Sequence, residues 1–214
     1  MQILLCAATD FEISETIAYI RDQKLSSISV LITGIGMTSA TYSLTKAVLS
    51  NKPDLIIQAG IGGALDNKLT LSSVWVIEQD MFGDLGVKEQ EQFLNLFDMN
   101  FLQENSFPWQ KGRLRNKLEY LPDQQLPKID GVTVNEITTH PDRIRYYKNE
   151  GAGIESMEGA ALHYVGLMEK VPFLQIRSIS NYVGERDKSK WQLRKSITEL
   201  NRELQTLLLK LLKQ

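Results

Sequence analysis

Short apolar segments alternate with segments of helical periodicity through the first half of the chain. Each apolar segment is a few residues long and is ended by polar residues or glycine, which is typical of buried strands. The order strand, helix, strand, helix, strand predicts an α/β fold in which neighbouring strands are parallel. The predicted strands are residues 2–8, 27–33, 55–59 and 74–78, and the predicted helices are residues 11–20 and 38–50.

The second half of the chain continues this alternation after a long segment with weak periodicity. Residues 80–127 are rich in aromatic side chains, so we expect an insertion that is either a lid over a site or a contact surface with a second subunit. The whole chain, residues 1–214, is predicted to be one domain, with residues 80–130 as this insertion. The later elements are a strand at 132–137, a helix from Pro141, a strand at 173–179 and a long amphipathic helix from about Ser189.

The composition excludes several classes of protein. A net charge of −2 provides no broad basic field for nucleic acid or anionic lipid. No apolar run approaches the length of a membrane span, and no basic segment precedes the first strand, so we expect a cytoplasmic protein. The single cysteine, Cys6, lies in an apolar run and allows no disulfide within the chain. His140 and His163 are isolated from other metal-binding residue types, so we expect neither a metal nor another cofactor.

Two glycine clusters follow predicted strands. Gly34-Ile35-Gly36 opens a helix, but Ser39 replaces the third glycine of a dinucleotide-binding motif, so that function is disfavoured. Gly60-Ile61-Gly62-Gly63 lacks the Lys-Ser/Thr pair of a P-loop, which excludes a nucleoside triphosphate site of that kind. Both clusters are consistent with tight turns that need positive φ, and with backbone N–H groups that face a ligand.

Two polar clusters in the last third of the chain lie at the ends of predicted secondary-structure elements. Residues 155–159 precede an apolar helical run that Glu158 opens, and residues 178–181 end an apolar strand. Open α/β sheets place their ligands at such ends of strands and helices. We therefore expect these clusters to form the walls of a small-molecule site.

In this order the segments resemble the nucleoside phosphorylase/hydrolase superfamily, and within it the nucleosidases that cleave purine from a 5′-modified ribose. The resemblance covers nearly the whole chain. The details are more similar to the futalosine hydrolases than to the methylthioadenosine/adenosylhomocysteine nucleosidases. The residues that carry it are Glu12, the glycine clusters at 34–36 and 60–63, residues 82–86, Ser156-Met157-Glu158-Gly159, and residues 177–187 with Trp191.

The resemblance implies a three-layer α/β fold with a central mixed, mostly parallel sheet. It also implies hydrolysis of the N-glycosidic bond of futalosine to hypoxanthine and dehypoxanthinyl futalosine, a step of menaquinone biosynthesis, by a homodimer or higher homo-oligomer. Glu12 would orient the attacking water, Glu158 and Met157 would hold the ribose, and Asn181 would contact the base. The other candidate substrate-binding residues are Ser156, Ile61, Gly62, Ser180, Phe82 and Arg186.

Asn181 takes the position of an aspartic acid in the methylthioadenosine enzymes. Adenine presents an acceptor at N7 and a donor at its 6-amino group, whereas hypoxanthine presents two acceptors, N7 and O6. An asparagine amide has two N–H donors, so Asn181 favours a 6-oxopurine. A turn residue at a strand end is the alternative interpretation of Asn181, and a capping box with Thr9 is the alternative for Glu12.

Three functions are left open by the residues themselves. The first is a futalosine-type nucleosidase, the second is a nucleosidase for methylthioadenosine, adenosylhomocysteine or aminofutalosine, and the third is a non-enzymatic nucleoside-binding protein. Hydrolysis is favoured over phosphorolysis, because the segment around Glu12 offers an acid where phosphate would need a cation. Arg186 and Lys88 are candidates to bind a substrate carboxylate, and Phe82 and Trp191 to stack on an aromatic group. For the two charged residues the competing interpretation is a solvated surface charge, and for the two aromatic residues it is packing in the core.

Overall fold

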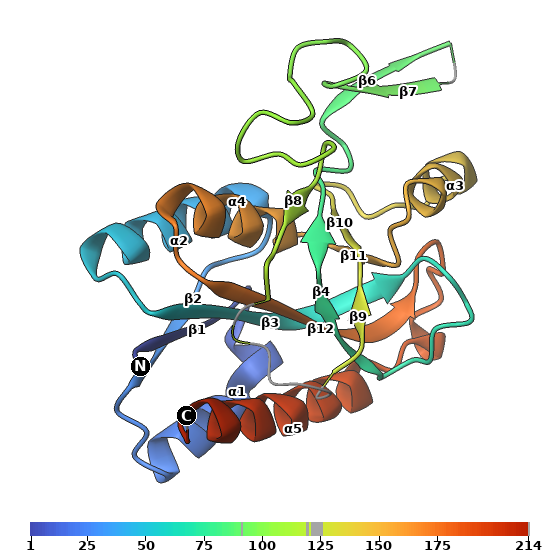
Figure 1. Ribbon diagram of the computed structural model, residues 1–214. Helices are drawn as coiled ribbons and strands as arrows, with labels where there is room; N and C mark the ends of the chain where they lie inside the picture. The colour runs from blue at the N-terminus through green and yellow to red at the C-terminus, as the bar shows by residue number, and fades with distance from the viewer. Residues whose placement is uncertain (91, 119, 121–125, 214) are drawn as a thin grey trace.

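A central sheet lies between two layers of helices in the computed structural model, which describes residues 1–90, 92–118, 120 and 126–213 (Figure 1). The strands are β1 (Ile3–Ala7), β2 (Ile28–Ile32), β3 (Leu55–Ala64), β4 (Val74–Ile77), β5 (Gln79–Asp80), β6 (Gly86–Glu89), β7 (Gln92–Asn95), β8 (Leu114–Arg115), β9 (Lys128–Ile129), β10 (Gly131–Thr133), β11 (Ile154–Ser156) and β12 (Phe173–Tyr182). The helices are α1 (Asp10–Asp22), α2 (Met37–Ser50), α3 (Pro141–Asn149), α4 (Gly159–Glu169) and α5 (Leu193–Leu211), with a short 3₁₀ helix η1 (Lys188–Lys190).

The sheet is mostly parallel and is organised around β3. Its strands follow the order β10-β11-β3-β12-β4-β9, and β1 pairs with both β2 and β3. The pairs β1–β2, β1–β3, β3–β12, β10–β11 and β4–β9 are parallel. The pairs β3–β11 and β4–β12 are antiparallel. The α/β class and the mixed sheet are confirmed, whereas the expectation that neighbouring strands are all parallel is wrong for β4.

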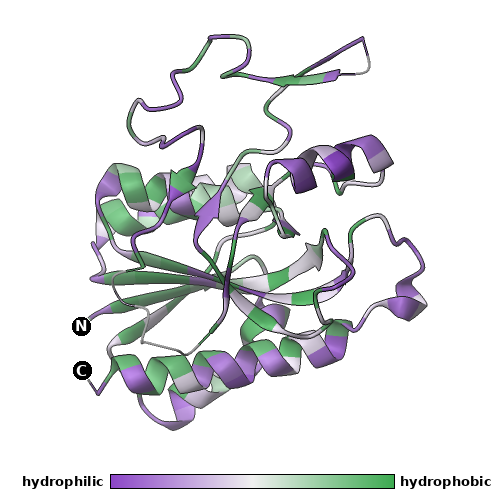
Figure 2. Ribbon diagram, turned by 45° about the vertical axis from the view of Figure 1, so that its right-hand side comes forward, coloured by the Kyte–Doolittle hydropathy of each residue, from purple (hydrophilic) through white to green (hydrophobic). Residues whose placement is uncertain are grey.

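Each face of the sheet has its own helical layer. The core on one face joins β1, β3 and β12 to α1 and α5, and the core on the other joins the same strands to α2 and α4. Figure 2 shows the same division, with mostly hydrophobic strands and with hydrophobic and hydrophilic residues along α5. In the part of the chain that the structure describes, no helix is long and apolar enough to cross a membrane.

The two glycine clusters differ in conformation. Gly34 and Gly36 have φ of 81° and 89°, so this cluster is a turn that favours glycine, as the sequence predicts. Gly60 to Gly63 instead continue β3, which runs to Ala64 rather than ending at Ala59. Glycine is needed there because side chains from elsewhere approach the strand closely: a Cβ on Gly60 would collide with the Arg177 guanidinium.

Other boundaries also differ from those that the sequence predicts. The strand predicted at 132–137 ends at Thr133, and β12 continues past 179 to Tyr182. The segment 80–130 forms short strands, among which β6 and β7 pair as a hairpin that stands away from the main sheet (Figure 1). Part of this segment, residues 91, 119 and 121–125, lies outside the described residues.

Truncating the apolar side of α5 should destabilise the whole fold. Leu204 is 0% exposed in the core between α5 and the sheet, whereas Leu209 on the same helix is 40% exposed. We expect Leu204→Ala to lower the free energy of unfolding by about 2–5 kcal/mol, because it leaves a cavity in a packed core. Leu209→Ala, the control, should change it by less than about 0.5 kcal/mol. Urea denaturation of both variants measures the difference, and equal losses would contradict this account of the core.

Candidate active site

One edge of β3 is uncovered where its two neighbours on that side separate. β1 pairs with residues from Leu55 to Gln58, and β11 pairs only with Gly63 and Ala64. A gap between neighbouring strands at their carboxyl ends is the place where open α/β sheets bind ligands. We call this unpaired edge of β3, residues 59–62, the crevice, and the candidate side chains lie around it.

Glu12 reaches this crevice from the first turn of α1. Its Oε2 accepts hydrogen bonds from the N–H and the hydroxyl of Thr9, at 3.0 and 3.1 Å, which confirms the predicted capping box. Its Oε1 accepts from the N–H of Ile61 at 3.1 Å. The same carboxylate thus caps a helix and binds the uncovered edge of β3, so the structural and the catalytic interpretations are compatible in geometry.

Directly behind Glu12, α1 is kinked. Ile13 has non-helical torsion angles (φ −126°, ψ 16°), and the side chain of Asn201 from α5 inserts at this point. Its Oδ1 accepts from the Thr16 N–H at 2.9 Å, and its Nδ2 donates to the Glu12 carbonyl at 2.9 Å. These two groups would bond each other in a regular helix, so Asn201 takes the place of that bond and fixes the turn that carries Glu12.

Glu158 enters the crevice from the other helical layer, at the N-terminus of α4. Its Oε1 accepts from the N–H of Gly36 at 2.9 Å, and its carbonyl accepts from Nε2 of Gln58 at 3.4 Å. Burial raises the pKa of this carboxyl, and the Arg177 guanidinium and the Gly36 N–H oppose the rise. The positive φ of Gly36 and the start of α4 together determine where this acid lies.

Arg177 on β12 links the two carboxylates. It is 1% exposed, its Nη2 lies 3.9 Å from Oε2 of Glu158, and the same nitrogen donates to Oε1 of Gln58 at 2.5 Å. A Cβ on Gly60 would meet both the Arg177 guanidinium and, at 2.9 Å, Oε1 of Glu12. A buried cation therefore lies near two acids that belong to different layers of the fold.

Ser180 and Asn181 lie near the end of β12, which pairs with β3 on the side away from β1 and β11. The Ser180 hydroxyl is 2.8 Å from Oδ1 of Asn181 and 3.2 Å from the Gly62 carbonyl, both of which can accept from it. The Asn181 amide donates to the Tyr182 carbonyl at 3.1 Å, and Asn181 is paired in register with Gly63. Ser180 thus orients the amide so that its nitrogen points away from the hydroxyl.

The remaining predicted residues divide into two groups. Ser156, whose hydroxyl accepts from the Gly159 N–H at 3.3 Å, and the half-buried Met157 directly precede Glu158, while Ile61 and Gly62 form the crevice edge. Phe82 instead packs among Trp109 and Tyr164, with ring centroids 5.7 and 6.3 Å away. Arg186 is exposed and lies over the Trp191 ring at 5.7 Å.

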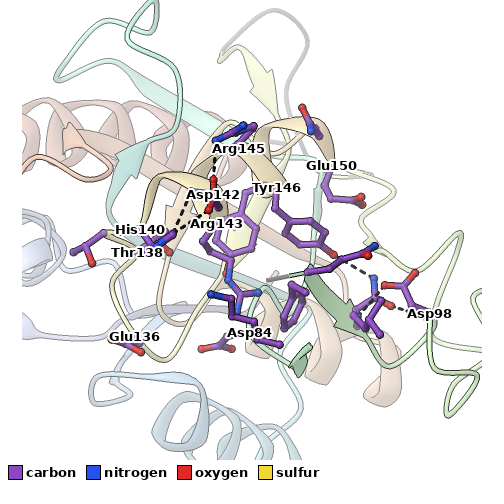
Figure 3. Close-up of a pocket in the computed structure, with 18 of the residues that line it drawn as sticks. Asp84, Asp98, Glu136, Thr138, His140, Asp142, Arg143, Arg145, Tyr146 and Glu150 are labelled. Atoms are coloured by element: carbon purple, nitrogen blue, oxygen red, sulfur yellow. Dashed lines mark hydrogen bonds and ion pairs between the residues drawn. The ribbon is translucent and has the colours of Figure 1, made fainter. Parts of the chain in front are cut away.

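A separate cavity of about 800 Å³ lies between the β6–β7 hairpin and α3 (Figure 3). Arg143 lies on its wall, 3.7 Å from the centroid of the Phe93 ring, and its Nη1 is 3.4 Å from the Gly83 carbonyl. Glu12, Glu158 and Asn181 are not among its lining residues. We therefore place the candidate active site at the β3 crevice and not in this cavity.

Sequence analysis did not single out a buried polar cluster beneath the first turn of α4. Thr133 accepts from the Ala160 N–H at 2.7 Å and donates to Oδ1 of Asp80 at 3.0 Å. Burial raises the pKa of Asp80 to about 7 and lowers the pKa of His163 to about 4. Sequence analysis also gave Arg177 no role of its own and did not single out Asn201. The sequence contained a signal for both, because each is a polar residue at a core position of a predicted strand or helix.

The crevice can stabilise a positive charge and donate hydrogen bonds to a negative one. In general, carboxylates favour a transition state that becomes cationic, and an oriented amide favours negative charge that develops on a leaving group. Backbone N–H groups of Thr9 and Ile61 hold the Glu12 carboxylate in place.

Comparisons with known proteins agree with this geometry. A family model described as "Phosphorylase superfamily" matches residues 13–213. Futalosine hydrolase of Streptomyces coelicolor is 29% identical over 176 residues, which cover 80% of this chain and 74% of the relative. Futalosine hydrolase of Thermus thermophilus is 29% identical over 183 residues, covering 83% and 80%.

Two further comparisons extend the likeness. The 5′-methylthioadenosine/S-adenosylhomocysteine nucleosidase of Bacillus subtilis is 25% identical over 186 residues, covering 80% of this chain and 77% of the relative. The structure of the futalosine hydrolase of Helicobacter pylori superimposes with a TM-score of 0.78 at 18% identity, covering 98% of each chain. The structural likeness, at this identity, establishes a shared fold.

Removing the side chain that is inserted into α1 should cost stability. Asn201→Ala leaves the Thr16 hydroxyl and two backbone groups of α1 without their buried partner, so we expect the free energy of unfolding to fall by about 1–3 kcal/mol. Thr198→Ala, at an exposed position of the same helix, should have little effect. Guanidinium denaturation compares the two variants, and an equal effect of both would show that Asn201 does not support the kink.

Proposed function

Because the chain belongs to the phosphorylase superfamily, we propose that it is a nucleosidase that hydrolyses the N-glycosidic bond of futalosine to hypoxanthine and dehypoxanthinyl futalosine. Relatives that match about four fifths of the chain are futalosine hydrolases, which supports this substrate. The observation that carries the proposal is the meeting of Glu12, Glu158 and the Ser180–Asn181 pair around one crevice. The reaction would serve menaquinone biosynthesis in the cytoplasm.

Cleavage of an N-glycosidic bond makes the ribosyl ring cationic and the departing purine anionic. We assign Glu158 to accept hydrogen bonds from the ribose hydroxyls, and its attraction for the ring would increase as positive charge develops. Glu12, held by Thr9 and Ile61, orients the water that attacks the ring carbon and takes its proton. The water supplies the new C–O bond as the C–N bond breaks.

Asn181 is the group assigned to the leaving base. Ser180 binds its amide oxygen, so the amide nitrogen is the atom presented to a ligand. One of its N–H groups donates to Tyr182, and the other can donate to N7 or O6 of a 6-oxopurine. Hydrogen bonding of this kind stabilises charge on the departing base without transferring a proton.

A nucleosidase for a 6-aminopurine substrate is the second candidate. Relatives of this chain include methylthioadenosine/adenosylhomocysteine nucleosidases, which supports the same reaction class. The two candidates share the roles of Glu12 and Glu158 and differ at the base. Asn181 counts against the 6-aminopurine nucleosidase, because the amide nitrogen of Asn181 and the 6-amino group of adenine are both donors and cannot bond each other.

We also propose that the whole chain is one nucleosidase domain that works as a homodimer or higher homo-oligomer, with residues 80–130 contributing to the subunit interface. Two aromatic side chains of this segment are strongly exposed, Phe101 at 74% and Phe107 at 66%. Exposed aromatic groups of this kind are enriched in the buried centres of protein interfaces. This favours an interface over a lid for that segment.

Neutralising either carboxylate should abolish most of the activity. We expect Glu12→Gln and Glu158→Gln each to reduce hypoxanthine release from futalosine by about 10²–10⁴-fold, since each removes a charge that acts in the transition state. Glu15→Gln, an exposed position on the same helix as Glu12, is the matched control. The assay measures the released base by chromatography, with and without phosphate. Near-normal turnover by either variant would exclude its assigned role, and a requirement for phosphate would indicate phosphorolysis.

The identity of residue 181 should decide which base is accepted. Purified protein is offered futalosine, aminofutalosine, methylthioadenosine and inosine, and we expect futalosine to be the preferred substrate. Asn181→Asp should lower kcat/KM for futalosine by about tenfold or more, because an ionised carboxylate repels O6 and N7. It should leave or improve the cleavage of aminofutalosine. If the same substitution improved both reactions, the 6-aminopurine nucleosidase would be the correct function.

A further inference from the structure

Glu158 is the N-cap residue of α4, but its side chain does not cap the helix. An N-cap side chain normally accepts a hydrogen bond from the N–H of the second or third helical residue. In α4 the Glu158 side chain makes no such bond, and its Oε1 accepts instead from the N–H of Gly36. The N–H groups in the first turn of α4 therefore need acceptors from outside the helix.

Thr133 of β10 supplies the missing cap. Its Oγ1 accepts from the N–H of Ala160, the second residue of α4, at 2.7 Å. The same hydroxyl donates to Oδ1 of Asp80 at 3.0 Å, so its proton points toward the carboxyl and its lone pairs are left for the Ala160 N–H. Ser156 accepts from the N–H of Gly159, the first residue of the helix, at 3.3 Å. Two donors of the first turn are thus satisfied by side chains outside α4.

The capping hydroxyl is held at a fixed point. Thr133 is 0% exposed, its N–H donates to the Met81 carbonyl at 2.8 Å, and its carbonyl accepts from the Gly83 N–H at 2.7 Å. Oδ1 of Asp80, which receives the hydroxyl proton, also accepts from the Met81 N–H at 2.8 Å. The backbone of Thr133 and its hydroxyl are therefore both bonded to the segment that begins at Asp80.

The start of α4 also packs tightly against side chains from the strands. A Cβ on Gly159 would collide with Oδ2 of Asp80 and with Nε2 of Gln175. Gln58, which is paired in register with Gln175, donates from its Nε2 to the Glu158 carbonyl at 3.4 Å. Because Glu158 precedes Gly159 directly, a shift of this turn would move the carboxylate that lies in the crevice.

We propose that Thr133 is a positioning residue for the proposed reaction: it caps α4 in place of Glu158 and so leaves the Glu158 carboxylate in the crevice. Asp80 orients the Thr133 hydroxyl for this role. The inference rests on the proposed function and extends it to two residues that touch no substrate. Without the hydroxyl, the Ala160 N–H would lack an acceptor, and the Glu158 side chain would turn back to cap its own helix at the expense of its bond to Gly36.

Thr133→Val tests the proposal, because valine has the shape of threonine without its hydroxyl. We expect this variant to lower kcat/KM for futalosine by about 10–100-fold, since the Glu158 carboxylate leaves its position. Thr133→Ser restores the hydroxyl and should restore most of the rate. Thr206→Val, at an exposed position of α5, is the matched control and should equal the unaltered protein. Full turnover by Thr133→Val would overturn the proposal.

A double-mutant cycle separates positioning from a merely structural role. If Thr133 acts through the Glu158 carboxylate, its hydroxyl has nothing left to position once that charge is removed. Adding Thr133→Val to Glu158→Gln should therefore lower the remaining rate by less than about twofold. A residue that only stabilises the fold would cause the same loss in both backgrounds, and that result would also overturn the proposal.

Amide hydrogen exchange, followed by NMR, reports the position of Glu158 without any turnover. The Gly36 N–H is bonded to the Glu158 carboxylate, so we expect it to exchange at least about tenfold faster in Thr133→Val than in the unaltered protein or in Thr133→Ser. The Ala40 N–H, which donates to the Gly36 carbonyl at 3.0 Å, is the internal control and should be unchanged.

The exchange measurement also distinguishes this inference from the proposed function. Unchanged exchange at Gly36, or equal acceleration at Gly36 and Ala40, would exclude the positioning role, because the second result indicates general loosening of α2. If Gly36 alone responds but the protein cleaves no nucleoside, the proposed function fails, and the placement of Glu158 by Thr133 stands.

Discussion

The buried guanidinium of Arg177 is the group on which the arrangement of the crevice depends. Glu12 arrives from α1 on one face of the sheet and Glu158 from α4 on the other, and both carboxylates lie close to it. Burial and the nearby Glu12 raise the pKa of Glu158, and the attraction of the Arg177 guanidinium opposes that rise. Gly60 is part of the same constraint, because only a residue without a side chain lets the guanidinium lie against β3.

Each acid of the crevice is also part of the secondary structure that holds it. Glu12 completes the cap of α1, and Asn201 fixes the kinked turn behind it; Glu158 stands at the start of α4 and binds the turn at Gly36. Rotating the Glu12 carboxylate would break the cap of α1, and rotating the Glu158 carboxylate would break its bond to the Gly36 N–H. Such supporting contacts hold the groups of a site in place before a ligand arrives, which is how electrostatic stabilisation becomes effective.

Local signals were enough to predict the α/β class, the capping box at Thr9, the turn at Gly34 and the start of α4 at Glu158, because neighbouring residues determine them. The strand through Gly60 to Gly63 was not predictable in this way. Its glycines are needed because Arg177 and Ile154, which are far away in sequence, pack closely against the strand. The same holds for Asn201, whose partners are in α1. The antiparallel pairing of β4 depends on a connection that periodicity cannot reveal.

The uncovered edge of β3 separates the residues that the proposed function assigns to the sugar from the one it assigns to the base. Gly60, beside Glu12 and Arg177, and Gly63, beside Glu155 and Asn181, lie three residues apart on an alternating strand and face opposite sides of the sheet. Because β1 and β11 leave the edge between them open, the proposed function has the ribose on one side of this edge and the purine on the other. On the proposed assignment, the bond that breaks lies at the open edge itself, where the Ile61 N–H already holds the carboxylate that directs the water.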